Sequence, residues 1–229
     1  MSDVTASRKF GTGPLSRVSA LIYTLLVVEL LVLLTAVPGL VVLVLLDRSA
    51  GNVPLMAACL LPAGPALSAA LYALRHRGRE LTELRPASAF WRGYRLNFGA
   101  AMKIWVPWLV VLALVGTNLG NFSAAGVPGW WAALLVVLAA GATLWVANAL
   151  VITSLFAFRA VDVAKLAAYS LGRFPGATLA NACLLIVAGG VTVVATEAAL
   201  ALLASVLTAT LLWNSRAMVT EVQQRFTRQ

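Results

Sequence analysis

Long apolar runs, separated by short polar clusters, most constrain what this chain can fold into. The runs cover residues 18–46, 53–74, 100–119, 130–158 and 177–213. A helix needs about 20 apolar residues to cross the hydrocarbon core of a bilayer, so each run is long enough to span a membrane. The chain is 61% apolar and only 11% charged, whereas about a quarter of a soluble domain is charged. We therefore predict an all-α bundle of transmembrane helices that forms a single membrane domain over residues 1–229.

The last run, 177–213, is too long for one straight span. As a single helix it would measure about 55 Å, almost twice the hydrocarbon thickness of about 30 Å. Glu197 carries the only charge within it, and a turn at Thr196 and Glu197 would put this carboxylate in headgroups or water. We expect two spans here, 177–195 and 197–213, and hence about six spans in all. One long helix, which gives five spans, is the alternative.

Basic residues predict the orientation, because cytoplasmic loops carry an excess of Lys and Arg. In a six-span topology, every basic residue except Arg48 falls on the side of the two termini. The loop from Asn118 to Gly129, on the other side, has no charge at all. We expect a multi-pass protein of the cell membrane, with both termini in the cytoplasm and the lipid bilayer as its first partner. The net charge of +9 follows from this topology, so we expect no nucleic-acid partner.

The second predicted cytoplasmic loop contains a segment that is both aromatic and basic. Its aromatic residues share one face of a helix: Phe90, Trp91, Tyr94 and Phe98. Arg92 and Arg95 lie elsewhere on the same helix. Such a segment predicts an amphipathic helix that lies at the level of the headgroups. The alternative is a docking helix that enters a partner protein.

Glu29 lies near the middle of the first span, where an ionised carboxylate costs about 2.5 to 3.5 kcal/mol. It needs a proton, water or a polar partner, and no basic residue lies at the centre of any span. The candidate partners are polar residues inside the runs: Asn118, Asn148, Asn181, Thr24 and Thr143. Two interpretations stay open. Glu29 either contacts an ion or substrate on a pathway, or is a protonated carboxyl group that is hydrogen-bonded between helices.

Prolines and small residues indicate how the helices are shaped and packed. The segment 61–65 contains Pro62 and Pro65, each of which removes a backbone hydrogen bond. A break here either shapes the packing or opens a cavity of the kind that discontinuous helices form in transporters. Small residues follow helical spacing in the stripe Ala66, Ala69, Ala70 and Ala73. Such a stripe lets membrane helices pack closely, and we predict an intramolecular packing face, with a dimer contact as the alternative.

Catalytic and metal-binding patterns are missing from the sequence. The only histidine, His76, lies between Arg75 and Arg77, so neither a Ser/His pair inside the membrane nor a His-rich metal site can form. The two cysteines, Cys59 and Cys183, lie in apolar runs, where a thiol usually serves in packing. The sequence has no P-loop for ATP and no paired carboxylates for acid–base chemistry. We expect no enzyme, no cofactor and no metal.

Four segments of the sequence resemble a known family. They are FGTGPL at 10–15, VELLVLLTAVP at 28–38, GPALSAALY at 64–72 and FWRGYRLNF at 90–98. In these segments the chain resembles the YesL-like bacterial membrane proteins, catalogued as domain of unknown function 624, and the resemblance runs over roughly 10–216. It departs from the family at Glu29, where Asn is common, and in 39–61, which is longer than usual.

The resemblance implies a function, since similar proteins are often encoded near carbohydrate ABC importers. The favoured hypothesis is a non-enzymatic accessory or scaffold component of such a system, with the ABC permease subunits as partners. The alternative is a small substrate-binding or conducting membrane protein with a polar site near Glu29. A membrane enzyme with an unrecognised site is the third hypothesis, and the missing acidic and His clusters disfavour it.

Overall fold

The computed structural model describes residues 14–76, 85–195 and 197–226 of the protein. These residues form helices joined by short turns, and no strand occurs among them. The prediction of an all-α bundle is therefore confirmed.

Five segments of the described chain are helical, long and apolar enough to cross a membrane. Four of them are single helices: α1 (Pro14–Leu45), α4 (Pro86–Gly120), α6 (Trp130–Leu155) and α8 (Pro175–Val194). The other consists of a 3₁₀ turn (Ala50–Asn52) followed by α2 (Val53–Cys59) and α3 (Ala63–Arg75). The five segments fit a multi-pass membrane protein.

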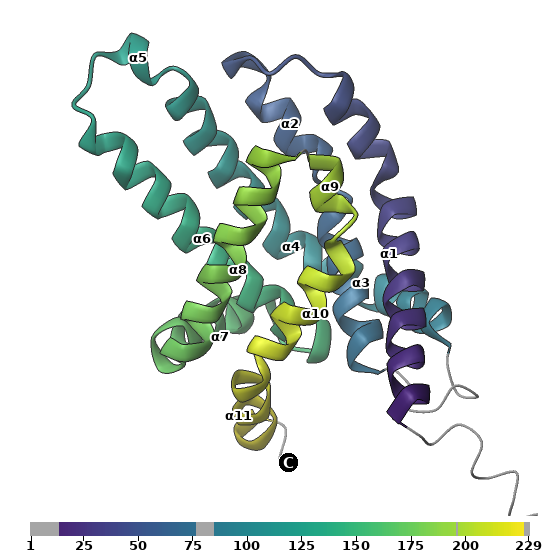
Figure 1. Ribbon diagram of the computed structural model, residues 1–229. Helices are drawn as coiled ribbons and strands as arrows, with labels where there is room; N and C mark the ends of the chain where they lie inside the picture. Colours follow the sequence, from purple (N-terminus) through teal and green to yellow (C-terminus); the bar gives the residue numbers. More distant parts are fainter. Residues whose placement is uncertain (1–13, 77–84, 196, 227–229) are drawn as a thin grey trace, which may run out of the picture.

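Shorter helices complete the chain. They are α5 (Phe122–Ala125), α7 (Ala160–Arg173), α9 (Glu197–Ala201), α10 (Ala204–Asn214) and α11 (Arg216–Phe226). Figure 1 shows α9 and α10 returning antiparallel beside α8 as an interrupted pass through the bundle. The run 177–213 is thus not one helix, since α8 ends at Val194 and α9 begins at Glu197. The short helices α9 and α10 are not among the five segments that are long enough to cross a membrane, so the sixth span stays a prediction. Thr196, part of the predicted turn, lies outside the described residues.

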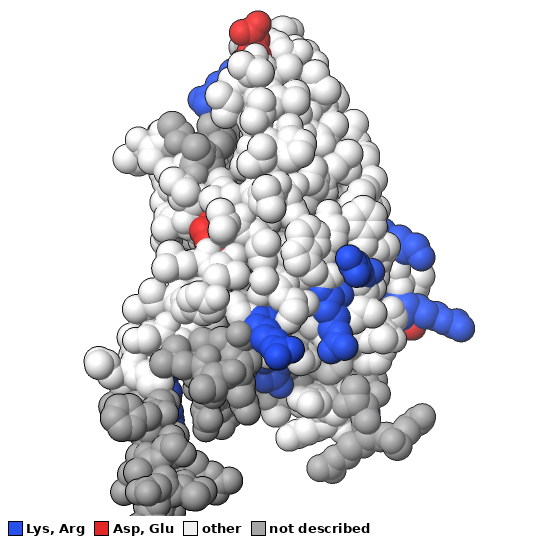
Figure 2. Space-filling model, turned by 90° about the vertical axis from the view of Figure 1, so that its right-hand side faces the viewer, with Lys and Arg blue, Asp and Glu red and all other residues white. Residues whose placement is uncertain are grey.

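The passes alternate in direction along the bundle (Figure 1). The first turns of α1 lie at the same end as α7 and α11, whereas α2 and α5 lie near the opposite end. In Figure 2, Lys and Arg gather over the lower part of the molecule, and a wide band above them carries no basic residue. This distribution is what the charge pattern of the loops predicts. The assignment of the basic end to the cytoplasm stays a prediction.

The start of α4 differs from the separate amphipathic helix that the sequence led us to expect. The aromatic and basic segment is helical, but it continues without a break into the third span. Pro86 occupies the first turn, where its missing N–H costs nothing. The helix then continues through Pro107, because a full break inside the bilayer would leave several backbone groups without partners.

Two apolar clusters form the core. The larger one combines Trp105 and Trp108 of α4 with buried residues of α3, α6, α7 and α11. In the smaller one, the alanine stripe of α3 packs against α1 and Phe90, and all four alanines are completely buried. The spacing of the alanines therefore predicted an intramolecular packing face correctly. The α3–α4 contact is equally close, since a Cβ atom added at Gly93 would lie 2.7 Å from the Cβ of Tyr72.

Candidate functional site

Glu29 of α1 is hydrogen-bonded to the backbone of α10. Its Oε2 accepts a hydrogen bond from the Ser205 N–H at 2.6 Å. Ser205 lies in the first turn of α10, where backbone N–H groups have no partner within the helix and the helix dipole is positive. Glu29 therefore caps α10 from another helix. Its second oxygen, Oε1, is buried and has no hydrogen-bond partner.

None of the predicted partners of Glu29 is hydrogen-bonded to it within the described chain. Thr24 donates to the carbonyl of Ala20, one turn earlier in α1. Asn118 is exposed near the end of α4 and donates to the carbonyl of Leu114. Thr143 donates to the carbonyl of Ala139 and accepts a long hydrogen bond from the Trp108 indole at 3.4 Å. The Ser205 partner was missed because a backbone N–H leaves no trace in the residue types of a sequence.

The other two predicted site residues, Asn148 and Asn181, do meet each other. Asn214 of α10 donates to Asn181 Oδ1 at 3.1 Å, and Asn181 of α8 donates to Asn148 Oδ1 at 3.4 Å. Asn148 of α6 in turn donates to Ser170 Oγ at 3.3 Å, and Ser170 donates to the carbonyl of Ala167 in α7. This amide chain of Asn214, Asn181, Asn148 and Ser170 links four helices. Because each group binds the next, the chain acts as an internal connection, separate from Glu29.

Contacts at Ser154, which the sequence analysis did not single out, connect α6 with α3 and α4. Ser154 of α6 donates to its own helix at the Leu150 carbonyl, so the hydroxyl of Ser68 on α3 donates to Ser154 at 2.8 Å. Asn97 of α4 donates to the Ser154 carbonyl at 3.3 Å. Ser68 and Ser154 are completely or almost completely buried. Small hydroxyl residues permit this close approach of membrane helices and supply polar contacts.

At the break between α2 and α3, a backbone group is bound by a side chain of another helix, as the Ser205 N–H is bound by Glu29 at the start of α10. Pro62 follows α2 and precedes the first residue of α3. The indole N–H of Trp105, on α4, donates to the Leu60 carbonyl at this break, at 2.9 Å. Irregular backbone at membrane depth is tolerated only where the protein supplies such partners. Each interrupted pass is therefore held by one polar side chain from a neighbouring helix.

A groove of about 530 Å³ lies beside this break, between α2 and α4. Its lining is mostly apolar and includes Leu61, Val106, Val110 and Leu114, with Thr117 and Asn118 as the polar members. The predicted site residue Asn118 thus belongs to this groove and not to the amide chain. An almost wholly apolar lining suits hydrocarbon better than a polar or charged substrate.

A second groove of about 530 Å³ lies between α7 and α11, at the end of the bundle where the basic residues gather. Ser170, the last member of the amide chain, lines it together with Tyr169 and Phe174. Charged residues also line it: Asp162, Lys165, Glu221 and Arg225. The groove therefore combines an apolar surface with charges of both signs.

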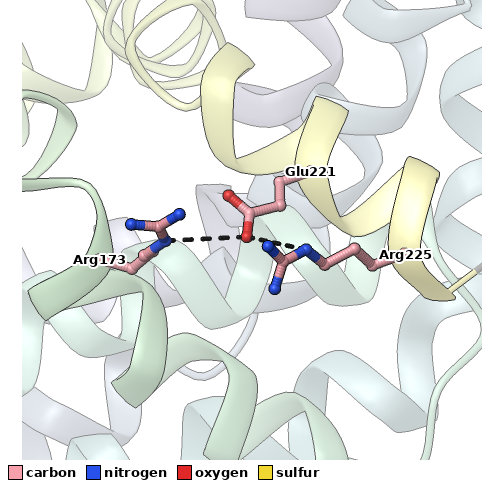
Figure 3. Close-up of polar contacts among 3 residues, drawn as sticks. All are labelled: Arg173, Glu221 and Arg225. Atoms are coloured by element: carbon pink, nitrogen blue, oxygen red, sulfur yellow. Dashed lines mark ion pairs between the residues drawn. The ribbon is translucent and has the colours of Figure 1, made fainter.

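One ion pair connects the two helices of this groove, and a second lies within α11. Figure 3 shows Arg173 of α7 and Arg225 of α11 directed at Glu221 from opposite sides. The Nε atoms of Arg173 and Arg225 lie 3.8 Å and 3.3 Å from Glu221 Oε1. This oxygen has no hydrogen bond of good geometry, so the attraction is between charges. Both arginine side chains are more than half exposed, and solvent screens such pairs strongly.

The aromatic residues at the start of α4 form a continuous series of ring contacts. Ring centroids are 6.3 Å apart for Phe90 and Tyr94, 5.7 Å for Trp91 and Tyr94, and 5.6 Å for Tyr94 and Phe98. Phe90 is completely buried, whereas Trp91 is 39% and Phe98 45% exposed. The aromatic face thus begins in the core and ends at the surface. Arg92 and Arg95 are exposed.

Comparison with known proteins connects this arrangement to one family. A family model described as "Protein of unknown function, DUF624" matches residues 21–119. The matched segment extends from α1 almost to the end of α4 and contains Glu29, the α2–α3 break and the aromatic face. No curated protein and no solved structure matches the chain. Within the described residues, no three His, Cys, Asp or Glu side chains are grouped so that they could hold a metal ion.

Proposed function

We propose, on the premise that residues 21–119 match the DUF624 family model, that this chain is a non-enzymatic accessory or scaffold subunit of a membrane transport system. The partner we propose is a carbohydrate ABC importer, as the sequence resemblance implies. The description of the family names no activity, so the geometry of the chain has to support the role.

The groove between α7 and α11 is the observation that carries this proposal. Inside the bundle, the amide chain and the pair of Ser68 and Ser154 bind one another or the backbone, so these polar groups serve the fold. The groove, by contrast, presents an uncovered surface of Tyr169, Phe174 and Leu166 beside charges of both signs. An amphipathic partner helix fits such a surface, with its apolar residues in the groove and its polar residues at the charged edge.

The charge distribution supports the location of this groove. Positively charged loops remain in the cytoplasm, and α7 and α11 lie at the basic end of the bundle (Figure 1). In that orientation the groove faces the compartment in which the ATPase subunits of an importer work. A scaffold needs no catalytic group, which agrees with the residue inventory of the sequence.

The test is affinity purification from native membranes in mild detergent, with quantitative mass spectrometry. We expect permease or ATPase subunits of an ABC importer in stoichiometric amounts with the unmodified protein. Tyr169→Glu, which places a charge in the groove, should lower their recovery at least tenfold. Val161→Glu is the matched control, because Val161 is also more than half exposed on α7 (64%, against 52% for Tyr169) but does not line the groove.

Two outcomes would contradict the proposal. Recovery of the unmodified protein alone would exclude a stable complex. Equal losses in the Tyr169→Glu and Val161→Glu variants would show that the groove is not the docking surface.

The alternative function, a small substrate-binding or conducting protein, has one observation in its favour. Glu29 Oε1 is buried without a partner, which leaves an acceptor for a bound cation or hydroxyl group. The hydrogen bond from Ser205 to Oε2 supplies the structural explanation instead. The Glu29 variants described in the Discussion distinguish the two.

A further inference from the structure

A basic stripe follows the exposed side of α4. At 100° per residue, Arg92, Arg95, Gly99 and Lys103 fall within about 80° of one another, and all four are exposed. The opposite side of the same helix is buried in the core: Phe90, Gly93, Ala101, Ile104 and Trp108. The three cations therefore project away from the bundle, into the region that lipid occupies around a membrane helix.

The cations of the stripe have no acidic neighbour on their own helix, since α4 contains neither Asp nor Glu. Among the residues that the structure describes, no ion pair involves Arg92, Arg95 or Lys103. Their charge is thus available to an anion from outside the chain. Guanidinium groups bind phosphate oxygens through charge-assisted hydrogen bonds, often two at a time.

Gly99 leaves an open position in the middle of the stripe. Apart from its chain neighbours and the adjacent backbone of α4 itself, no atom lies within 4 Å of a Cβ added there, so an incoming group can approach the helix backbone closely. Side chains on a helix lean toward its N-terminus, and Lys103 therefore extends back toward Gly99 and Arg95. The rise from Arg95 to Lys103 is about 12 Å, which is wide enough for a phosphodiester headgroup.

The same side of α4 becomes apolar beyond Lys103. Val106, Val110 and Leu114 continue the stripe and are 36%, 53% and 61% exposed. These three residues also line the apolar groove between α2 and α4. This order of groups along one helix face matches a phospholipid. The cations suit its anionic headgroup, and the apolar groove suits its acyl chain. A free phosphate ion would use only the first half of this surface.

Aromatic residues beside the stripe place it at the membrane interface. Trp91 and Phe98 flank its basic part and are partly exposed, and Trp is enriched where hydrocarbon meets headgroups. We propose that Arg92, Arg95 and Lys103 bind the headgroup of an anionic phospholipid, whose acyl chain enters the groove between α2 and α4. The site selects lipid by charge and lies in the leaflet at the basic end of the bundle.

The test compares phosphatidylglycerol with phosphatidylcholine of identical acyl chains, added to the purified full-length protein in detergent. Native mass spectrometry measures how much of each lipid is retained. The unmodified protein should prefer phosphatidylglycerol. Because each basic residue near an anionic surface contributes about fivefold in affinity, Arg92→Gln with Arg95→Gln should weaken phosphatidylglycerol binding about 25-fold.

A matched control removes the same charge elsewhere. Arg159→Gln with Lys165→Gln also takes two positive charges from the basic end, and should leave retention within about twofold. Both pairs are surface substitutions, and circular dichroism checks that the helices persist. Val110→Trp, which obstructs the groove, should lower the retention of both lipids and leave the preference between them unchanged.

Three results would overturn the proposal. The first is equal retention of the two lipids by the unmodified protein. The second is an equal loss of phosphatidylglycerol in the two double variants, which would indicate a general effect of net charge. The third is displacement of phosphatidylglycerol by a modest excess of inorganic phosphate, which would make the stripe a phosphate site without lipid specificity.

Discussion

Replacing Glu29 with alanine removes the only described partner of the Ser205 N–H. Ser205 is 2% exposed, so water cannot take the place of the carboxylate. A buried N–H left without a partner costs about 1 to 3 kcal/mol, and a lost helix cap typically costs about 1 kcal/mol. Hydrogen bonds between membrane helices average only about 0.6 kcal/mol and reach about 1.7 kcal/mol. We therefore expect Glu29→Ala to lower the free energy of unfolding by about 1 to 2 kcal/mol.

This loss can be measured as a thermal unfolding shift in detergent. For a chain of this length, 1 kcal/mol corresponds to about 2 to 4 °C in Tm, so Glu29→Ala should lower Tm by about 2 to 8 °C. Glu29→Gln keeps an oxygen acceptor for the Ser205 N–H and should lower Tm by less than half as much. Asn118→Ala is the control, because the exposed Asn118 amide bonds only within its own turn.

The reasoning would be refuted if Glu29→Ala had the same Tm as Asn118→Ala. That result would show that the hydrogen bond to Ser205 contributes nothing to the fold, and would favour Glu29 as a contact for a bound ion or substrate. A Glu29→Gln variant that is as unstable as Glu29→Ala would show that the charge, and not the acceptor geometry, holds α10.

Three further substitutions test the packing and polar contacts by the same Tm measurement. Gly64→Ala should destabilise the protein by about 1 to 3 kcal/mol because its methyl group would overlap the Trp105 ring. The control Gly141→Ala, in open space on α6, should be neutral or slightly stabilising. Equal changes in Tm for the two variants would contradict the close contact between Gly64 and Trp105. Asn181→Ala interrupts the amide chain and should cost about 1 kcal/mol; an unchanged Tm would show that the chain is not stabilising. Glu221→Gln should change stability by less than about 1 kcal/mol, since its two arginine partners are exposed; a larger loss would mean that solvent does not screen these pairs.

The turn within 177–213 shows what local hydropathy can predict. The run is nearly twice as long as one span, and Glu197 is its only charge. Length and the position of one charge were enough to expect the turn, which the structure places between α8 and α9. The alanine stripe of α3 was equally predictable, because helical spacing alone brings small residues to one face.

The start of α4 shows where local patterns stop being sufficient. The aromatic and basic residues predicted an amphipathic helix, but they do not indicate whether that helix ends before the next span. Its continuity depends on the packing of Gly93 against Tyr72 and on the burial of Phe90. These are contacts with α3 and α1, which a pattern within α4 cannot contain.

The sequence by itself determined the class of this protein, its apolar passes and the uneven placement of its charges, because the bilayer acts on each segment separately through length and polarity. Only the tertiary structure decided which polar groups meet. Glu29 binds a backbone N–H 176 residues away, and Trp105 binds a carbonyl at a break in another pass. The backbone N–H and C=O groups look alike along the sequence. Which of them bind a side chain of another helix therefore depends on how the helices cross in space.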